Sequence, residues 1–265
     1  MATCTNSDPF VTTARTNLDQ ALADTLADIR AEVYPAASFV KAQPDIFNYS
    51  NYGHLTEIPQ GSNRLSEFDP FVFDFTFGRG PVGLYNPGSG RIFIKKTKWC
   101  RHTLIHETLH SVSTFAEQRN IRTGSQYLFL NEGLTELFSG YILWKRYHDC
   151  YVFWKNRQPF VRCTSSTSYH KWTRIWYTFC RFVPFNTVAE LFFNDKHLSW
   201  TDQWSNFLED ISSVGYAFND PLRSGKGILE ERFLAECKNN FGENMVEEIF
   251  DKDSYDFDFS KLIII

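Results

Sequence analysis

Apolar side chains recur every three or four residues along much of the chain, which is the spacing of helices that bury one face. Residues 10–34 form the first such pattern, and a proline at position 35 is expected to end it. Residues 150–265 contain several more, so we expect a mostly helical second half. Their apolar positions are Trp172, Ile175, Trp176 and Phe179; Val188, Leu191 and Phe192; Trp204, Phe207, Leu208 and Ile211; Ile228, Phe233, Leu234 and Cys237; and Val246, Ile249 and Phe250.

A different spacing, with apolar side chains at every second position, predicts strands in the first half. Residues 71–77 place a phenylalanine at alternate positions, and residues 91–96 form a second short apolar run. Residues 78–90 hold five glycines and two prolines and are expected to form turns. Strands before the middle of the chain and helices after it indicate an α+β protein.

Composition supports a folded chain with a large core. Of the 265 residues, 43% are hydrophobic and 17% aromatic, which argues against disorder. The length fits one large domain or two subdomains that share a core, and we place the division at residues 1–119 and 120–265. The net charge is −4 without strong charge blocks, so we expect no nucleic-acid partner.

The N-terminal residues contain no apolar segment typical of a signal peptide, and no run of 18 apolar residues predicts a membrane span. We therefore expect a cytoplasmic protein, or a secreted one if a longer precursor is trimmed. The six cysteines form no C-x-x-C pair. Free buried thiols are expected, although the even number allows disulfides.

Residues 99–119 form a helical pattern that contains His106, Glu107 and His110 in the arrangement H-E-x-x-H. Histidines four residues apart lie above one another on a helix, so both can bind one metal ion. Glu107 borders that face, where it could take a proton from a water molecule. The arrangement is a signature of zinc-dependent peptide hydrolysis, although three fixed letters also occur by chance. A buried helix is favoured by the apolar flanks Leu104, Ile105, Leu109, Val112 and Phe115.

His102 extends this row of histidines by one turn. At 1.5 Å per residue, His102 and His110 lie about 12 Å apart along the axis. Zinc binds nitrogen at about 2 Å. We therefore expect His102 to lie at the helix start or behind a ligand, and not to bind the same ion.

The segment NEGLTE, residues 131–136, supplies two carboxylates at the start of another helical pattern. Catalytic zinc has three protein ligands and one open position. Glu132 follows His110 by 22 residues, which is enough chain for a second helix to return beside the first. Glu136 lies one turn further on, from where it could hydrogen-bond the outer nitrogen of a ligating histidine. Acidic residues also favour the first turn of ordinary solvated helices.

HETLH followed by NEGLTE resembles the gluzincins, the zinc peptidases that include thermolysin-like endopeptidases and one-site metallo-aminopeptidases. The resemblance covers about forty of the 265 residues. It implies a zincin-like fold, with a small mixed sheet and the HExxH helix in the N-terminal subdomain and a mostly helical C-terminal subdomain. It also implies roles for five residues: His106, His110 and Glu132 as ligands of one Zn²⁺, Glu107 as general base, and Glu136 as the partner of a ligating histidine.

These observations predict a peptidase that acts on peptide or protein substrates. One-site aminopeptidases carry a G-x-M-E-N segment before the zinc helix, and this chain lacks it, so an endopeptidase is expected. Residues 91–96 come just before the helix, and we expect this strand to lie at the sheet edge and to pair with an extended substrate. Two alternatives remain open: a zincin-fold binding or scaffold protein without turnover, and a zinc hydrolase of a non-peptide bond.

Peptidases of this kind usually use a tyrosine or histidine to donate a hydrogen bond to the oxyanion. The sequence does not choose among the candidates, which are Tyr127, His148, Tyr169, His170, Tyr177 and His197. The sequence also leaves the oligomeric state open.

Overall fold

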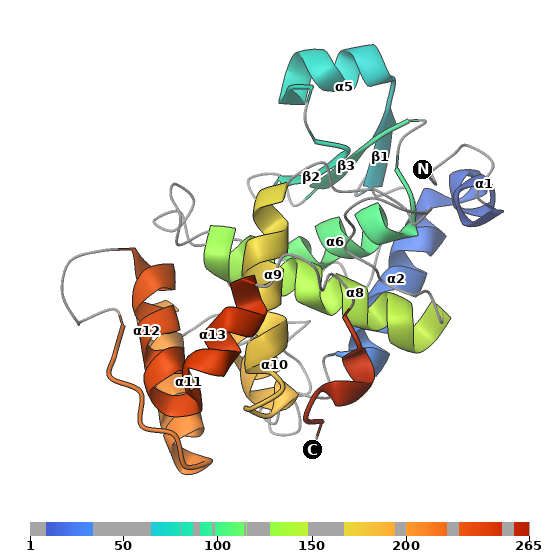
Figure 1. Cartoon of the computed structure of the whole chain (residues 1–265). Helices are drawn as coiled ribbons and strands as arrows, with labels where there is room; N and C mark the ends of the chain where they lie inside the picture. Colours follow the sequence, from blue (N-terminus) through green and yellow to red (C-terminus); the bar gives the residue numbers. More distant parts are fainter. Residues whose placement is uncertain are drawn as a thin grey trace.

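The computed structural model describes residues 9–33, 65–79, 81–86, 91–96, 99–113, 115, 128–147, 167–193, 200–221, 228–250 and 257–264. Within these residues the chain is mostly helical and contains one small mixed sheet (Figure 1). The expected α+β class is therefore confirmed.

The described residues form a succession of helices and strands along the chain. In order they are α1 (Pro9–Thr16), α2 (Leu18–Glu32), β1 (Leu65–Phe68), α5 (Pro70–Phe77), β2 (Gly83–Asn86), β3 (Arg91–Lys95), α6 (Arg101–Val112), the π-helical turn η4 (Leu128–Glu132), α8 (Gly133–Tyr147), α9 (Thr167–Phe179), α10 (Phe185–Phe192), α11 (Trp200–Ser213), α12 (Leu229–Phe241), α13 (Glu243–Phe250) and the 3₁₀ turn η5 (Phe259–Lys261).

The sheet has the strand order β1–β3–β2, so β3 is its central strand. β3 pairs in parallel with β1 and antiparallel with β2. Ile92 and Ile94 of β3 are fully buried, whereas Phe93 points to the opposite face and stacks on Phe77 of α5 with ring centroids 5.1 Å apart. In Figure 1, α5 lies above the sheet and α6 below it.

The prediction of a strand at residues 71–77 is wrong, because these residues form helix α5. Asp69 caps the helix by accepting a 2.9 Å hydrogen bond from the backbone N–H of Phe71, and Pro70 fits the first turn. Gly78 follows the last residue with a φ of 91°, a conformation that other residues rarely adopt. These end signals determine the helix, and two of its four phenylalanines remain largely exposed.

Two other expected elements have different bounds. The helix expected at residues 10–34 is interrupted at Asn17, whose extended backbone and side chain cap α2 through a 3.0 Å hydrogen bond from Gln20. The turn region expected at residues 78–90 contains strand β2. Strand β1 was not anticipated, since its four residues lie at the end of a stretch without a clear pattern.

The helix that carries the H-E-x-x-H residues is α6, and it is shorter than expected. It begins after Cys100, whose backbone N–H donates a 3.4 Å hydrogen bond to the hydroxyl of Thr103. It ends at Val112, because Ser113 takes up an extended conformation. The last residues of the expected helix, 116–119, lie outside the described part of the chain.

Helix α6 is enclosed by its neighbours, which explains its burial. It packs against α2, α8, β2 and β3, while α9 packs on α8 and η4. Most of the apolar stripes expected after residue 150 are buried in this core, among them Trp176, Phe179 and Phe233. Each such side chain contributes about 1.5–3 kcal/mol relative to exposure. Ile228, just before α12, is an exception with 38% exposure.

The core joins side chains from both halves of the chain in one cluster, which includes Leu104 of α6 and Phe233 of α12. The boundary expected between residues 119 and 120 lies outside the described residues. The two-subdomain division therefore stays a prediction.

The expectation of free thiols is wrong for Cys100, which is disulfide-bonded. Cys180 and Cys237 are free and buried, as expected, and burial raises the pKa of both thiols. Since these are the other cysteines within the described residues, the partner of Cys100 lies outside them.

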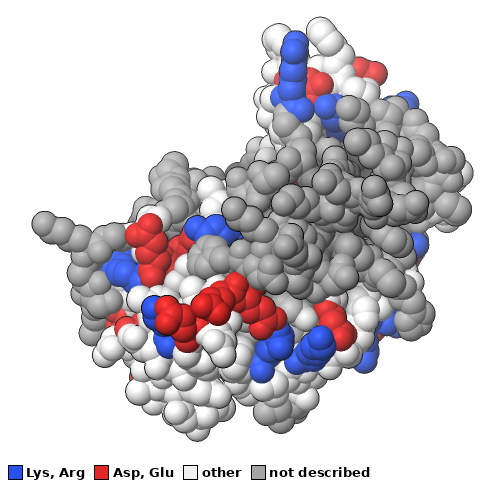
Figure 2. Space-filling view, in the orientation of Figure 1, with Lys and Arg blue, Asp and Glu red and all other residues white. Residues whose placement is uncertain are grey.

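Charged side chains of both signs are interspersed on the face shown in Figure 2. None of the described helices is long and apolar enough to cross a membrane.

Candidate metal centre

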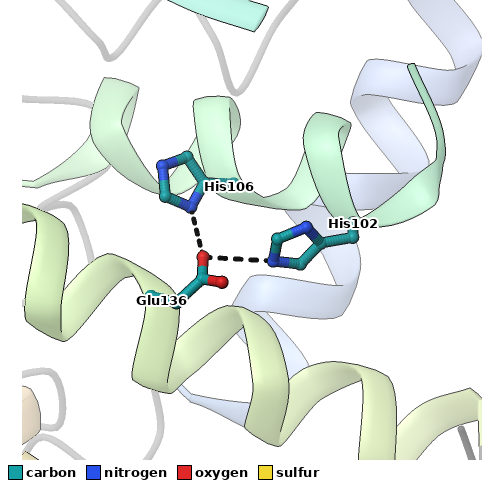
Figure 3. Close-up of side chains that lie close together, drawn as sticks. All are labelled: His102, His106 and Glu136. Atoms are coloured by element: carbon teal, nitrogen blue, oxygen red, sulfur yellow. Dashed lines mark hydrogen bonds and ion pairs between the residues drawn. The ribbon is translucent and has the colours of Figure 1, made fainter. Parts of the chain in front are cut away.

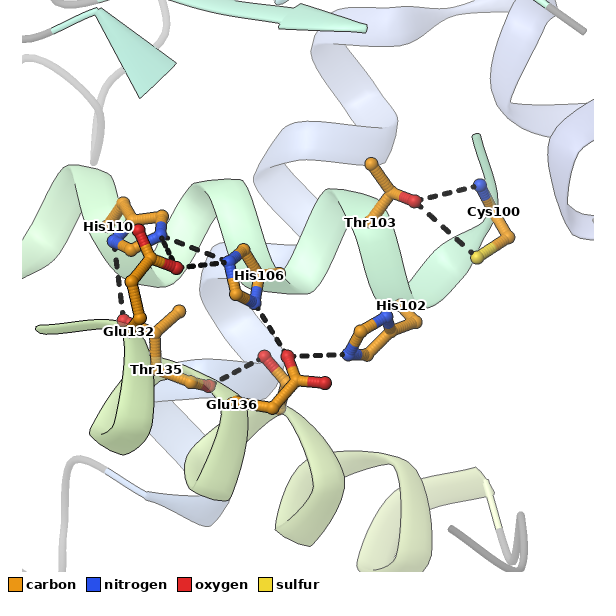
Figure 4. Close-up of polar contacts among 9 residues, drawn as sticks. Cys100, His102, Thr103, His106, His110, Glu132, Thr135 and Glu136 are labelled. Atoms are coloured by element: carbon orange, nitrogen blue, oxygen red, sulfur yellow. Dashed lines mark hydrogen bonds and ion pairs between the residues drawn. The ribbon is translucent and has the colours of Figure 1, made fainter. Parts of the chain in front are cut away.

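Helix α6 presents three histidines to helix α8. His102, His106 and His110 follow one another at intervals of four residues, so they lie along one face of the helix (Figure 4). Their relative exposures are 4%, 7% and 6%. Buried polar side chains need hydrogen-bond partners, so we expect the partners of these histidines on the facing segment, η4 and α8.

The π-helical turn η4 carries the third candidate ligand, Glu132, as its last residue. Such turns are rare and often occur at functional sites. The indole N–H of Trp176 on α9 donates a 2.8 Å hydrogen bond to the Phe129 carbonyl, and the two rings stack with centroids 4.9 Å apart. Gly133 permits close approach of α9, since a Cβ there would lie 2.8 Å from the Cβ of Trp172. Helix α9 therefore holds the turn from which Glu132 reaches α6.

Three ligand atoms converge between α6 and η4. The Nε2 atoms of His106 and His110 are 3.0 Å apart, and Oε2 of Glu132 lies 3.3 Å from the first and 3.4 Å from the second. Atoms bound tetrahedrally to zinc at about 2.0–2.1 Å lie roughly 3.3–3.4 Å from one another. The three atoms thus have the spacing of one face of a zinc tetrahedron, and this buried group could hold a metal ion.

The ionisation of Glu132 also fits a bound cation. Its Oε2 atom is buried and makes no hydrogen bond within the described residues. Burial alone raises the pKa of this carboxyl, but the charge of His110 and the contacts with both histidines outweigh it and hold the pKa well below its ordinary value. A buried carboxylate oxygen of this kind is costly unless a cation satisfies it.

Glu136 lies between His106 and His102, as Figure 3 shows. Its Oε2 atom is 2.8 Å from Nδ1 of His106 and 3.1 Å from Nε2 of His102. Burial opposes ionisation of Glu136, yet His102 and His106 keep its pKa well below the ordinary value. For His106, burial lowers the pKa, but Glu132 and Glu136 outweigh that effect and raise it well above 6.5.

These contacts determine which nitrogen of His106 is available. In the neutral ring, Nδ1 donates its proton to the Glu136 carboxylate, and Nε2 is then the nitrogen whose lone pair can bind a metal in place of a proton. His110 has a similar arrangement, because the hydroxyl of Thr135 lies 3.3 Å from its Nδ1. Sequence reasoning missed Thr135, although its place between Glu132 and Glu136 on the same helix face could have indicated it.

Glu107 contacts the sheet. One of its carboxylate oxygens accepts a 2.7 Å hydrogen bond from the backbone N–H of Tyr85 on β2. Burial raises its pKa, although the two neighbouring histidines oppose the shift. A Cβ at Gly83 would lie 2.7 Å from the Cγ of Glu107, so glycine is needed for β2 to approach the helix so closely. Nothing in the local pattern around residues 83–85 indicated this role.

The strand expected to lie at the sheet edge does not do so. β3 has a neighbour on each side, so its backbone groups are already paired. The strand that contacts Glu107 is β2, which within the described residues has β3 as its one neighbouring strand. The expected substrate-pairing role of residues 91–96 is therefore wrong.

Of the six candidates for oxyanion stabilisation, the structure describes the side chain of Tyr177 alone. Tyr177 is tied to the C-terminal segment, because its hydroxyl donates to the Asp258 carbonyl and accepts from the Asp258 N–H, both at 3.0 Å. Tyr169 and His170 lie on α9, where the structure describes the backbone but not these side chains. The other three lie outside the described residues: Tyr127, His148 and His197.

Comparison with protein-family models, curated proteins and solved structures finds no match for this chain. Any functional conclusion therefore depends on the geometry of the site itself.

Proposed function

We propose that this protein is a zinc-dependent peptidase with a zincin-like arrangement of its site. His106, His110 and Glu132 hold one Zn²⁺, and Glu107 is the general base. The observation that carries the proposal is the spacing of the three ligand atoms, 3.0, 3.3 and 3.4 Å, beside a buried glutamate in H-E-x-x-H order. Unrelated surface histidines would not need to converge in this way with a carboxylate from another helix.

The chain's own residues would divide the chemical work. Zinc, when bound, lowers the pKa of a water molecule towards neutrality and polarises a carbonyl group. Glu107 accepts the proton from the attacking water and passes it to the leaving amine. The Tyr85 N–H holds one of its oxygens, so we assign the proton transfer to the other.

We further propose that β2, and not β3, binds the extended substrate. The Lys95 N–H donates to the Val82 carbonyl at 2.8 Å, so in this antiparallel register Gly83 and Tyr85 direct their backbone groups away from β3. The Tyr85 N–H on that side donates to Glu107, so we assign the backbone groups of Gly83 to the pairing with a peptide. An internal peptide segment fits this mode, in agreement with the expected endopeptidase.

A cleavage assay tests the proposal. A denatured-protein library is incubated with the zinc-loaded chain, with and without a chelator, and new N-termini are identified by mass spectrometry. Chelator-sensitive cleavage within chains whose N-termini are acetylated supports a zinc endopeptidase. Zinc binding without cleavage favours a scaffold or a hydrolase of another bond. The absence of both zinc binding and cleavage would contradict the proposal.

The disulfide at Cys100 bears on the compartment. Disulfides persist mainly in oxidising environments such as the extracellular space. We therefore propose that the protein works in such a compartment, in preference to the cytoplasm expected from the sequence. Mass measurement after alkylation, with and without reduction, tests this on protein isolated from its natural source: Cys100 should be alkylated only after reduction.

A further inference from the structure

His102 contacts Glu136, although it is not one of the residues assigned to zinc. Its Nε2 atom lies 3.1 Å from Oε2 of Glu136, the same oxygen that lies 2.8 Å from Nδ1 of His106 (Figure 3). Glu136 is fully buried and comes from α8, whereas both histidines come from α6. One carboxylate oxygen therefore receives two ring N–H groups from successive turns of the facing helix.

Two physical requirements explain the second donor. A fully buried carboxylate is costly unless several donors satisfy it. It must also stay in one position to orient His106, because its hydrogen bond fixes both the ring plane and the nitrogen left for the metal. A single bond leaves the carboxylate free to rotate about that contact, whereas donors on either side of Oε2 fix its position.

A second metal ion is the main alternative, since His102, His106 and Glu136 also have ligand atoms within 4.8 Å of one another. That ion would need Nδ1 of His106. A neutral imidazole offers only one lone pair, and in His106 it is used on Nε2, which faces His110 and Glu132. The second group is therefore better satisfied by hydrogen bonds than by a metal.

We propose that His102 is a positioning residue for the metal centre: it fixes the Glu136 carboxylate, which in turn orients His106 towards zinc. The inference rests on the proposed zinc site and adds a residue that the H-E-x-x-H and NEGLTE segments do not include. It acts through a hydrogen bond to the inner carboxylate and not through contact with metal or substrate.

A matched pair of substitutions tests this role. In His102→Gln the amide nitrogen is as many bonds from Cα as Nε2 of histidine, so it can still donate to Glu136. In His102→Asn the side chain is one carbon shorter and cannot reach. Zinc affinity is measured by competition with a chromophoric chelator. His102→Asn should weaken it about tenfold or more, as loss of an outer partner of a ligand typically does, while His102→Gln should stay within about threefold of the wild type.

The same variants in a Glu136→Gln background complete the test. If His102 acts through Glu136, His102→Asn should weaken zinc binding much less when Glu136 is already changed. Thr108→Val serves as a control for α6, because it removes the hydrogen bond from the Thr108 hydroxyl to the Leu104 carbonyl on the opposite face of the helix. It should lower the melting temperature of the zinc-free protein and leave zinc affinity unchanged.

The outcomes separate this inference from the proposed function. Equal zinc affinity in His102→Asn and wild type overturns the positioning role, and so does equal loss in the Asn and Gln variants. Two zinc ions per wild-type chain would make His102 a ligand and also overturn it. A wild type that binds no zinc removes the proposed function and this inference together.

Discussion

The backbone N–H of Tyr85 and the carboxylate of Glu107 are joined by a 2.7 Å hydrogen bond between the sheet and helix α6. The contact requires β2 to lie directly against α6, which is possible because residue 83 has no side chain. A second glycine has the corresponding role on the other side of the site, where Gly133 admits Trp172 beside the turn that carries Glu132. The proposed base, Glu107, and the proposed third ligand, Glu132, thus each lie beside a close approach at a glycine.

The two glycines give a first prediction, in which two similar substitutions have different effects. In Gly83→Ala the new Cβ would crowd Cγ of Glu107 at 2.7 Å, so turnover should fall about tenfold to 100-fold while zinc affinity is kept. In Gly133→Ala the Cβ would meet Trp172 at 2.8 Å and displace the turn, so zinc affinity should fall about tenfold. Steady-state kinetics and chelator competition measure both. The assignment fails if both variants lose zinc equally.

The role of Glu107 as base gives a second prediction. Glu107→Gln keeps the size of the side chain and removes its ability to take a proton. We expect hydrolysis to fall by roughly 100- to 10,000-fold, with zinc content unchanged. Full activity in this variant would falsify the mechanism.

The hydrogen bond from Trp176 to the π-helical turn gives a third prediction. Trp176→Phe keeps an aromatic ring against Phe129 but leaves the Phe129 carbonyl without its 2.8 Å donor. An unsatisfied buried carbonyl costs about 1–3 kcal/mol, so the turn should shift and zinc affinity should fall. Trp204→Phe is the matched control, because Trp204 is fully buried and its indole N–H makes no hydrogen bond within the described residues. Equal zinc affinity in the two variants would contradict the role of Trp176.

An acidic pair outside the site gives a prediction on pH. Burial, then the nearby Glu190, raises the pKa of Asp210 from 3.8 to about 6. The folded protein therefore holds this proton more tightly than the unfolded chain, and stability falls as the pH rises from about 4 to about 6. Asp210→Asn removes that loss, so the variant should melt higher than the wild type at pH 7.5 and not at pH 3.5. A difference in melting temperature that is the same at both pH values would show that Asp210 does not titrate as described.

The candidate site residues could be predicted from the sequence because their spacing determines which side chains share a helix face. The interval of four residues places His106 and His110 on one helix face, and the chemistry of zinc calls for a third ligand. The structure brings Glu132 to them and Glu136 behind His106. The Tyr85 N–H and the Trp176 indole act through tertiary contacts with the Glu107 carboxylate and the Phe129 carbonyl, and no local sequence pattern indicates these partners.

The errors in the fold have two physical causes. In α5 the alternation of phenylalanines was outweighed by Asp69, Pro70 and Gly78, which fix the ends of a helix more strongly than side-chain pattern fixes a strand. The second cause is the weak sequence signal of β1, which led to a wrong prediction of the strand order. Whether β3 lies at the centre or the edge of the sheet depends on where β1 pairs, and the four residues of β1 carry too little signal to predict it.

The zinc content of the purified chain tests the central claim most directly. Protein equilibrated with zinc and then freed of loosely bound metal is analysed by inductively coupled plasma mass spectrometry, for the wild type and for Glu132→Ala. We predict one zinc ion per wild-type chain and almost none in the variant. A wild-type chain without zinc, or a variant that retains it fully, would contradict a centre formed by His106, His110 and Glu132.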